Sequence, residues 1–294
     1  SIRSVPRKLG FVGSTAAIAL FAGVTFAAML PHISVVLASL SVEGAWYDSI
    51  VPTQWTTHNY DTALSHSLAS DSIRNSLAYS SIAIGIDLFV GLAIGYLIVR
   101  VKVRGRGLVD ALAMLPLAVP GLVMAFGYVA MTLRWPFGKD DPLEGFISVV
   151  GANPNPMLLL VIAYAVRRLP YIVRSTVAGL EQTSGELEEA ALNLGASRTR
   201  AIRTVVIPLI TANLIAGGLL AFSFAMLEVS DSLILAQRES DYPITKAIYV
   251  LFERLGDGPG IASAMGVWAM ALLAVTLVGA SVLMGRKMGA IFRV

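Results

Sequence analysis

Six long runs of mostly apolar residues constrain the fold of this chain more than any other feature. They are Phe11–Leu37, Leu77–Val99, Leu108–Leu133, Met157–Val177, Ile207–Leu227 and Ile261–Met284. A helix needs about 20 apolar residues to cross the hydrocarbon core of a bilayer. Because 56% of the 294 residues are hydrophobic and only 14% are charged, a soluble bundle would lack the polar surface to cover these helices. The sequence therefore predicts an all-α transmembrane fold of six helices, forming one domain over residues 1–294.

Positive charge is distributed unevenly between the segments that join these runs. If the N-terminus is inside, sixteen of the 22 Lys and Arg residues fall in inside segments: Arg3, Arg7, Lys8, Arg100, Lys102, Arg104, Arg106, Arg167, Arg168, Arg174, Arg198, Arg200, Arg203, Arg286, Lys287 and Arg293. The first outside loop is acidic instead, with Glu43, Asp48, Asp61 and Asp71. Because Lys and Arg concentrate on the cytoplasmic side, both termini are predicted to be cytoplasmic. The first run is too long for a signal peptide and lacks a clear cleavage site, so we expect a retained span.

The composition excludes several kinds of site. The chain has no Cys, which rules out disulfides, thiol nucleophiles and cysteine-ligated metals. Its three His residues stand singly, without metal-ligand spacing. A formal net charge of +3 gives no argument for nucleic acid. We therefore expect no metal site, no cofactor, no catalytic residue and no nucleic-acid partner.

The polar segment 180–208 between the fourth and fifth runs carries ordered helix signals. Thr183 and Glu186 have the spacing of a capping box, which starts a helix. Leu187, Ala190, Ala191 and Leu194 follow at helical spacing, and Gly195 supplies the left-handed conformation that ends helices. A second helix is predicted over 196–206, and Pro208 opens the fifth span, where a missing amide costs little. Such a shaped loop either fits a partner protein or rests on lipid headgroups.

This loop resembles the EAA loop of binding-protein-dependent ABC importer permeases. Glu189, Ala190 and Ala191 are followed after three residues by Gly195, and Val205-Val206-Ile207-Pro208 stands where the family pattern has I-x-L-P. Val205 and Ile207 are mild apolar departures from the usual Ile and Leu. The resemblance extends from about Leu64 to the C-terminus. The segments 115–121 and 167–179 look like the ferric-iron, polyamine and aminophosphonate branch of the family.

The resemblance implies a type I importer fold in the bacterial or archaeal inner membrane. It also implies three kinds of partner: ATP-binding subunits that receive the loop, an extracytoplasmic solute-binding protein, and a second permease subunit of the same or a homologous chain. The solute implied first is ferric iron, with polyamine, aminophosphonate or oxyanion solutes left open. Glu189, Ala190, Ala191, Gly195 and Pro208 are the expected ATPase-coupling residues. No G-x-x-x-x-G-K-[ST] motif occurs in the chain, so ATP hydrolysis is expected in a partner subunit.

Two other classes of protein are alternatives. A gradient-driven transporter would favour several paired ionisable residues within its spans, but only Asp87 lies clearly in the middle of one. Asp110 lies near the cytoplasmic end of the third predicted span. A membrane enzyme would need paired acids, a Ser–His–Asp set or a metal cluster, and the sequence shows none of these. Co-purification of an ATPase and a binding protein separates these classes.

Proline and glycine are unusually placed in two of the predicted spans. Pro116, Pro120 and Gly121 lie in the middle of the third, where a proline removes an amide donor and kinks a helix. A broken helix in a bilayer often lines a transport pathway, and a packing kink is the alternative. In the second span, Gly91 and Gly95 have the spacing that lets two helices approach closely.

Glu228 and Asp231 form a pair of acids toward the outer end of the fifth predicted span. Residues three apart share a face on a continuing helix. Because a carboxylate is unfavourable when it faces lipid, both are predicted to point inward. They either line the pathway of a cationic or metal-bearing solute or form an interhelical ion pair, with Arg254 or Arg238 as the expected partner.

Overall fold

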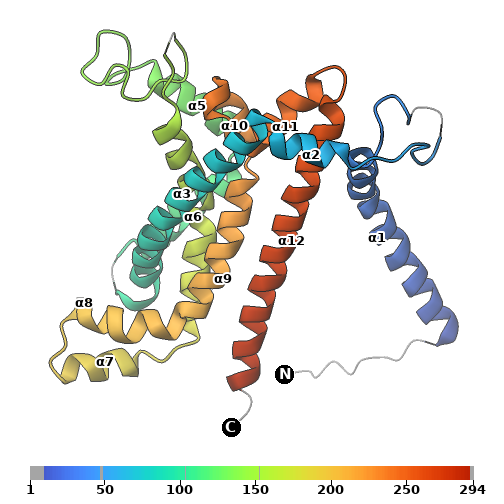
Figure 1. Cartoon of the computed structure of the whole chain (residues 1–294). Helices are drawn as coiled ribbons and strands as arrows, with labels where there is room; N and C mark the ends of the chain where they lie inside the picture. Colours follow the sequence, from blue (N-terminus) through green and yellow to red (C-terminus); the bar gives the residue numbers. More distant parts are fainter. Residues whose placement is uncertain (1–9, 47–48, 103, 152, 292–294) are drawn as a thin grey trace.

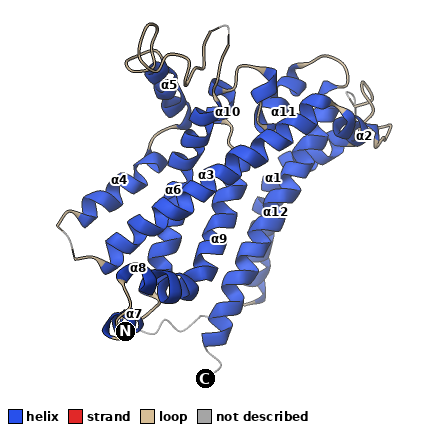
Figure 2. Ribbon diagram, turned by 60° about the vertical axis from the view of Figure 1, so that its left-hand side comes forward, coloured by secondary structure: helices blue, strands red, loops and turns tan. Residues whose placement is uncertain are grey.

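The fold is known from a computed structural model that describes residues 10–46, 49–102, 104–151 and 153–291. Its helices are α1 (Phe11–Ser39), α2 (His58–Ser65), α3 (Ser67–Arg100), α4 (Arg106–Ala118), α5 (Gly121–Thr132), α6 (Met157–Glu181), α7 (Glu186–Asn193), α8 (Arg198–Ala201), η1 (Ile202–Val206), α9 (Ile207–Met226), α10 (Ser230–Leu235), η2 (Glu239–Asp241), α11 (Ile244–Glu253) and α12 (Gly258–Ile291). Within these residues no strand forms, only isolated bridges (Figure 2). The predicted all-α class is confirmed.

The predicted spans correspond to α1, α3, the α4–α5 pair, α6, α9 and α12. Among the described residues, Phe11–Ser39, Ser67–Arg100, Arg198–Leu235 and Gly258–Val282 are long and apolar enough to cross a membrane. The pair α4 and α5 qualifies only as one bent span. Helix α6 has 25 residues and carries three arginines. Figure 1 shows α7 and α8 at one end of the bundle and α2, α5, α10 and α11 at the other.

The third predicted span is not one helix. Helix α4 ends at Ala118 and α5 begins at Gly121, and the two helices meet at 102°. Pro116 lies inside α4 and does not break it. Pro120 is the residue that stops the helix, because the residue before a proline is forced out of the helical conformation, and Val119 is extended.

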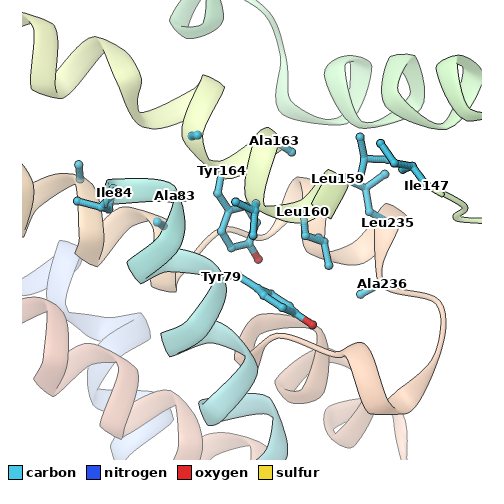
Figure 3. Close-up of a cluster of buried hydrophobic side chains, with 14 of the residues drawn as sticks. Tyr79, Ala83, Ile84, Ile147, Leu159, Leu160, Ala163, Tyr164, Leu235 and Ala236 are labelled. Atoms are coloured by element: carbon cyan, nitrogen blue, oxygen red, sulfur yellow. The ribbon is translucent and has the colours of Figure 1, made fainter. Parts of the chain in front are cut away.

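Helices α3 and α6 pack closely, and glycine makes this possible. A Cβ atom built on Gly91 would lie 2.6 Å from Cγ2 of Ile172, and one on Gly95 would lie 2.6 Å from Cγ2 of Thr176. The close approach predicted from the spacing of the two glycines is therefore confirmed. Beside this contact lies the largest buried cluster, centred on Tyr164 of α6 and Tyr79 of α3 (Figure 3).

Helix α1 stands at the edge of the bundle and contacts α12. Ser39 is its only buried residue among those described. The start of α1 and the end of α12 lie at the same end of the bundle as α7 and α8 (Figure 1). Of the charges used for the orientation, Arg3, Arg7, Lys8, Asp48 and Arg293 lie outside the described residues. Arg286 and Lys287 belong to α12.

The assignment of Arg167, Arg168 and Arg174 to the inside loop was wrong. All three lie within α6, which continues to Glu181. Arg167 and Arg168 occupy the middle of this helix, and their side chains are largely buried against acidic residues. The excess of positive charge at the α7–α8 end therefore rests on fewer residues than the sequence indicated.

Candidate functional site

The helical loop, residues 180–208, forms a corner at Gly195. Gly195 has φ +88°, as predicted from its place after the helix. The Gly195 amide donates to the Leu192 carbonyl at 2.9 Å, and the Ala196 amide donates to the Ala191 carbonyl at 3.0 Å. These two bonds make a Schellman motif, which satisfies the last carbonyl groups of α7. Gly195 therefore sets the direction in which the chain leaves α7.

After Gly195 the chain continues into the bundle as consecutive helical segments, α8, η1 and α9, with no second sharp turn. The Ser197 hydroxyl accepts a hydrogen bond from the Arg200 amide at 3.3 Å and caps α8. A π-helical segment, Ile202–Val206, joins α8 to α9. Pro208 lies in the first turn of α9, as expected. The predicted second helix, 196–206, is thus α8 with η1, and it continues directly into the span.

The start of α7 differs from the predicted capping box. The N-cap residue is Gly185, and no side chain caps the helix there. Ser184 Oγ accepts from the Glu186 amide at 3.2 Å. The hydroxyl of Thr183 instead accepts from Arg100 at 3.2 Å. The capping box does not form because α7 begins at Glu186, so that Thr183 lies two residues before the N-cap, where Arg100 binds its hydroxyl.

Most residues of the EAA-type pattern are exposed on the surface of the chain. Glu189 and Ala190 are exposed, Ala191 is half-buried, and Gly195 is exposed. The apolar residues beside them are also exposed, since Leu187 is 52% and Leu194 is 90% exposed. In the described part of the chain, no other element covers this side of α7. The face is therefore available to a partner or to the membrane surface.

The buried acid of α7 is Glu188, which the sequence analysis did not single out. Glu188 is 8% exposed. It accepts a hydrogen bond from the Tyr96 hydroxyl of α3, and its Oε2 lies 3.8 Å from Nε of Arg100. A signal was present in the sequence, because Tyr96 and Arg100 are four residues apart and share a helix face. From its position alone, Arg100 counts only as an inside charge that indicates orientation.

A second group of charged side chains is buried near the opposite end of the bundle. Nε and Nη2 of Arg167 donate to the two carboxylate oxygens of Asp231 at 2.9 and 3.1 Å. Arg168 pairs with Glu228. Asp231 is 0% and Glu228 is 5% exposed, so the predicted inward orientation of both acids is confirmed. We call these four residues the ion cluster.

The expected arginine partners of these acids were wrong. Arg238 pairs with Asp241 at 3.0 Å, and Arg254 pairs with Glu239 at 3.4 Å. Both pairs are on the surface, on residues that follow α10. The partners of the buried acids are instead in α6. Arg167 and Arg168 fall within the predicted span Met157–Val177 but were counted as inside charges, so their pairing with the acids was missed.

The ion cluster joins the break between α4 and α5 to the corner between α9 and α10. Nη2 of Arg167 also donates to the Gly121 carbonyl at 3.2 Å, at the start of α5. A Cβ on Gly121 would lie 2.7 Å from Cβ of Ser230 and 3.2 Å from Nη1 of Arg167. Gly121, Glu228 and Asp231, predicted separately as pathway candidates, therefore meet at Arg167. Pro120 lies just before them as the N-cap residue of α5, and Pro116 is one turn away in α4.

Hydrogen bonds extend from the ion cluster into the buried core. The Ser232 hydroxyl donates to the Glu228 carbonyl at 2.5 Å and lies 2.6 Å from the Tyr164 hydroxyl. The Thr245 hydroxyl donates to the same carbonyl at 2.6 Å. Hydrogen bonds between helices in a membrane average about 0.6 kcal/mol each. Together they hold the α9–α10 corner against α6 and α11.

Asp87 is a separate buried acid, in the middle of α3. It is 1% exposed, and its Oδ2 has no hydrogen-bond partner among the described residues. Together with the ion cluster it gives the bundle several ionisable groups, the feature expected of a gradient-driven transporter. The described residues contain no group of three His, Asp or Glu residues that could hold a metal ion.

These features define a multi-pass α-helical membrane protein with a helical loop at one end and a broken helix held by buried ion pairs near the other. Residues 87–286 match the family described as the binding-protein-dependent transport system inner membrane component, and the chain belongs to this family. The resemblance read from the EAA-type pattern is thereby confirmed, and the chain is a multi-pass protein of the bacterial inner membrane.

Several curated relatives are similar to this chain. The ferric transport system permease protein FbpB of Actinobacillus pleuropneumoniae is 30% identical over 227 residues, which cover 76% of this chain and 30% of FbpB. The molybdenum transport system permease protein ModB of Escherichia coli K12 is 29% identical over 207 residues, 69% of this chain and 87% of ModB. The chain thus spans less than a third of FbpB but most of ModB.

Solved structures share the fold. A bacterial ABC transporter that imports the acidic polysaccharide alginate superposes with a TM-score of 0.67 at 16% identity, covering 95% of this chain and 98% of that chain. The MetNI methionine ABC transporter superposes with a TM-score of 0.53 at 14% identity, covering 76% and 95%. At these identities the likeness concerns the fold alone.

Proposed function

We propose that this chain is the permease subunit of an ATP-driven importer and forms the pathway through which a solute crosses the membrane. Family membership supports this proposal. The single observation that carries it is α7, which presents the EAA-type residues on an uncovered face, at the end of the bundle where α3 and α6 end and α9 begins. The chain itself hydrolyses no ATP in this scheme, and a separate subunit supplies the energy.

The proposed partners follow from the same surfaces. ATP-binding subunits take the exposed face of α7, with Glu189, Ala190, Ala191 and Gly195 as the contact and Pro208 at the start of the span behind it. A solute-binding protein docks at the opposite end, on which α2, α10 and α11 lie. A second permease subunit, the same or homologous, covers apolar surface such as that of α1. Both termini lie on the ATPase side in this arrangement.

Ferric iron is the solute proposed first, because the FbpB relatives are ferric permeases. Oxyanions are the alternative, since the relatives also include ModB and the sulfate permease CysT. Polyamines and aminophosphonates are further alternatives for the solute. Mass spectrometry of the ligand carried by the cognate binding protein decides between them.

Reconstitution tests the function itself. The chain is assembled in proteoliposomes with its ATPase and binding protein, and ATP hydrolysis and solute uptake are measured together. The proposal expects uptake that needs ATP and hydrolysis that rises when the loaded binding protein is added. Uptake driven by an ion gradient without ATP would instead establish the secondary transporter.

A further inference from the structure

Arg100 binds the chain segment that enters α7. It is the last residue of α3. Its Nη2 donates to the Leu180 carbonyl at 3.1 Å, the Thr183 carbonyl at 2.8 Å and the Thr183 hydroxyl at 3.2 Å. One guanidinium group thus contacts carbonyl groups at the end of α6 and in the turn before α7. The Leu180 carbonyl also accepts from the Thr183 amide at 3.3 Å and from the Thr183 hydroxyl at 3.2 Å, so Arg100 reinforces a turn that the chain already forms.

Tyr96 and Arg100 also hold α7 itself. The Tyr96 hydroxyl donates to Oε1 of Glu188, and the Arg100 guanidinium faces Oε2 at 3.8 Å. Glu188 points into the protein, whereas Glu189, the acid of the EAA-type pattern, points out. The two neighbouring acids of α7 therefore face opposite sides, one toward α3 and the other toward the exposed surface.

Helix α3 connects this contact to the far end of the bundle. It has 34 residues without an internal proline, so it is about 50 Å long. At the far end, Asn75 donates to the Ser240 and Tyr242 carbonyls at 2.8 and 3.1 Å. The Ser76 hydroxyl accepts from the Ile244 amide at 2.8 Å. One rigid helix thus carries polar contacts to α7 at one end and to the start of α11 at the other.

We propose that Tyr96, Arg100 and Glu188 are positioning residues that fasten α7 to α3, so that a displacement of α7 moves α3 and the α11 end of the bundle with it. We call this set the α3–α7 latch. This inference rests on the proposed function, because the displacement comes from the ATPase. In this arrangement Glu189 meets the ATPase, and Glu188 passes the movement to the membrane helices.

The first experiment compares Glu188→Ala and Tyr96→Phe with Glu186→Gln, an exposed acid on the same helix, as the matched control. Each variant is reconstituted with the ATPase and binding protein, and the amount of assembled complex, the ATP hydrolysed and the solute imported are measured. Both latch variants are expected to assemble and to hydrolyse ATP, while the solute imported per ATP falls at least about fivefold. The control keeps the wild-type ratio.

The second experiment follows the movement directly. The chain has no native cysteine, so Asp71→Cys on α3 and Asn193→Cys on α7 can carry spin labels for distance measurement by electron resonance. In the wild-type chain the distance between the labels should stay constant between the nucleotide-free and ATP-trapped complexes. With Glu188→Ala added, it should change between the two states. A distance that changes equally in both chains overturns the latch.

The outcomes separate this inference from the proposed function. If Gly195→Val abolishes stimulation of the ATPase but Glu188→Ala and Tyr96→Phe keep the wild-type ratio, only the latch is wrong. The latch is also wrong if these variants only reduce the amount of assembled complex, and the complex that does assemble imports solute normally. If the wild-type chain neither binds nor stimulates an ATPase, the proposed function fails, and the latch fails with it.

Discussion

Arg167 and Asp231, 64 residues apart in the sequence, form a bidentate ion pair in which two guanidinium nitrogens donate to the two carboxylate oxygens at 2.9 and 3.1 Å. The same arginine reaches the carbonyl of Gly121. Three chain segments, the middle of α6, the start of α5 and the start of α10, thus meet at one buried side chain. Arg167 thus holds the start of α5, directly after the break at Pro120, against α6 and α10.

Loss of the Asp231 charge should destabilise the subunit. Asp231→Asn leaves Arg167 buried without its full counter-charge, at a cost of about 3–5 kcal/mol. Thermal denaturation and the yield of assembled complex should both fall. Asp241→Asn is the control, because its partner Arg238 is 51% exposed and such pairs contribute about 0–1 kcal/mol.

Glu228→Gln extends this test, because Glu228 pairs with Arg168. The ion-pair role predicts that this variant also reduces assembly. If assembly is intact and transport is lost, the acids line the pathway instead. Unchanged assembly and unchanged transport in both variants would refute both roles.

Gly121 should not tolerate a side chain. In Gly121→Ala, the new methyl group meets Cβ of Ser230 at 2.7 Å, and overpacking of this kind costs about 1–3 kcal/mol. Gly127→Ala on the same helix is the control, since a Cβ there has no neighbour within 4 Å. Thermal unfolding of the purified subunit measures the difference. The double variant Gly121→Ala with Ser230→Gly should recover part of the loss, and no recovery would contradict the contact.

Gly195→Val should uncouple the importer without removing the subunit from the membrane. A valine has space there, because nothing lies within 4 Å of a built Cβ, but φ is +88°. The left-handed conformation costs about 1–2 kcal/mol for an L-residue. The variant should therefore change the orientation of α7 relative to α8. Binding-protein-stimulated ATPase activity and transport should fall.

Two variants serve as controls for this corner. Ala196→Val places the same side chain at a residue without a positive φ and should remain active. Gly195→Asn should lose less than Gly195→Val, because asparagine adopts the left-handed conformation more readily. Normal stimulation by Gly195→Val would remove the coupling role of the corner.

The break between α4 and α5 should change its exposure during transport. Single cysteines at Val119 and Met124 should react at different rates in the nucleotide-free and ATP-trapped complexes, because the break is expected to line the moving pathway. A cysteine at Arg106, at the exposed start of α4, is the control and should react equally in both states. Equal rates at Val119 and Met124 would make the break a packing feature only.

The helix ends show how far local patterns predicted this fold. The corner at Gly195 was predicted, and so was a kink from Pro116, Pro120 and Gly121, because each depends on the conformational limits of one residue type; which proline stops the helix was not predicted. The capping box at Thr183 was also a local prediction, and it was wrong. Arg100 of α3 binds the Thr183 hydroxyl, and no pattern within the loop could show this contact.

By itself, the sequence determined the all-α membrane class, the helix corner, the close approach at Gly91 and Gly95, and the family. The membrane class follows from the length of the apolar runs, the corner and the close approach follow from the properties of glycine, and the family follows from a motif. None of these needs knowledge of the neighbouring helices. Only the tertiary structure decided that Arg167 and Arg168 pair with Asp231 and Glu228, and that Glu188 rather than Glu189 is buried. The physical reason is that the partner of a charged side chain depends on how each helix is rotated and placed against the others. Packing between distant segments sets that rotation.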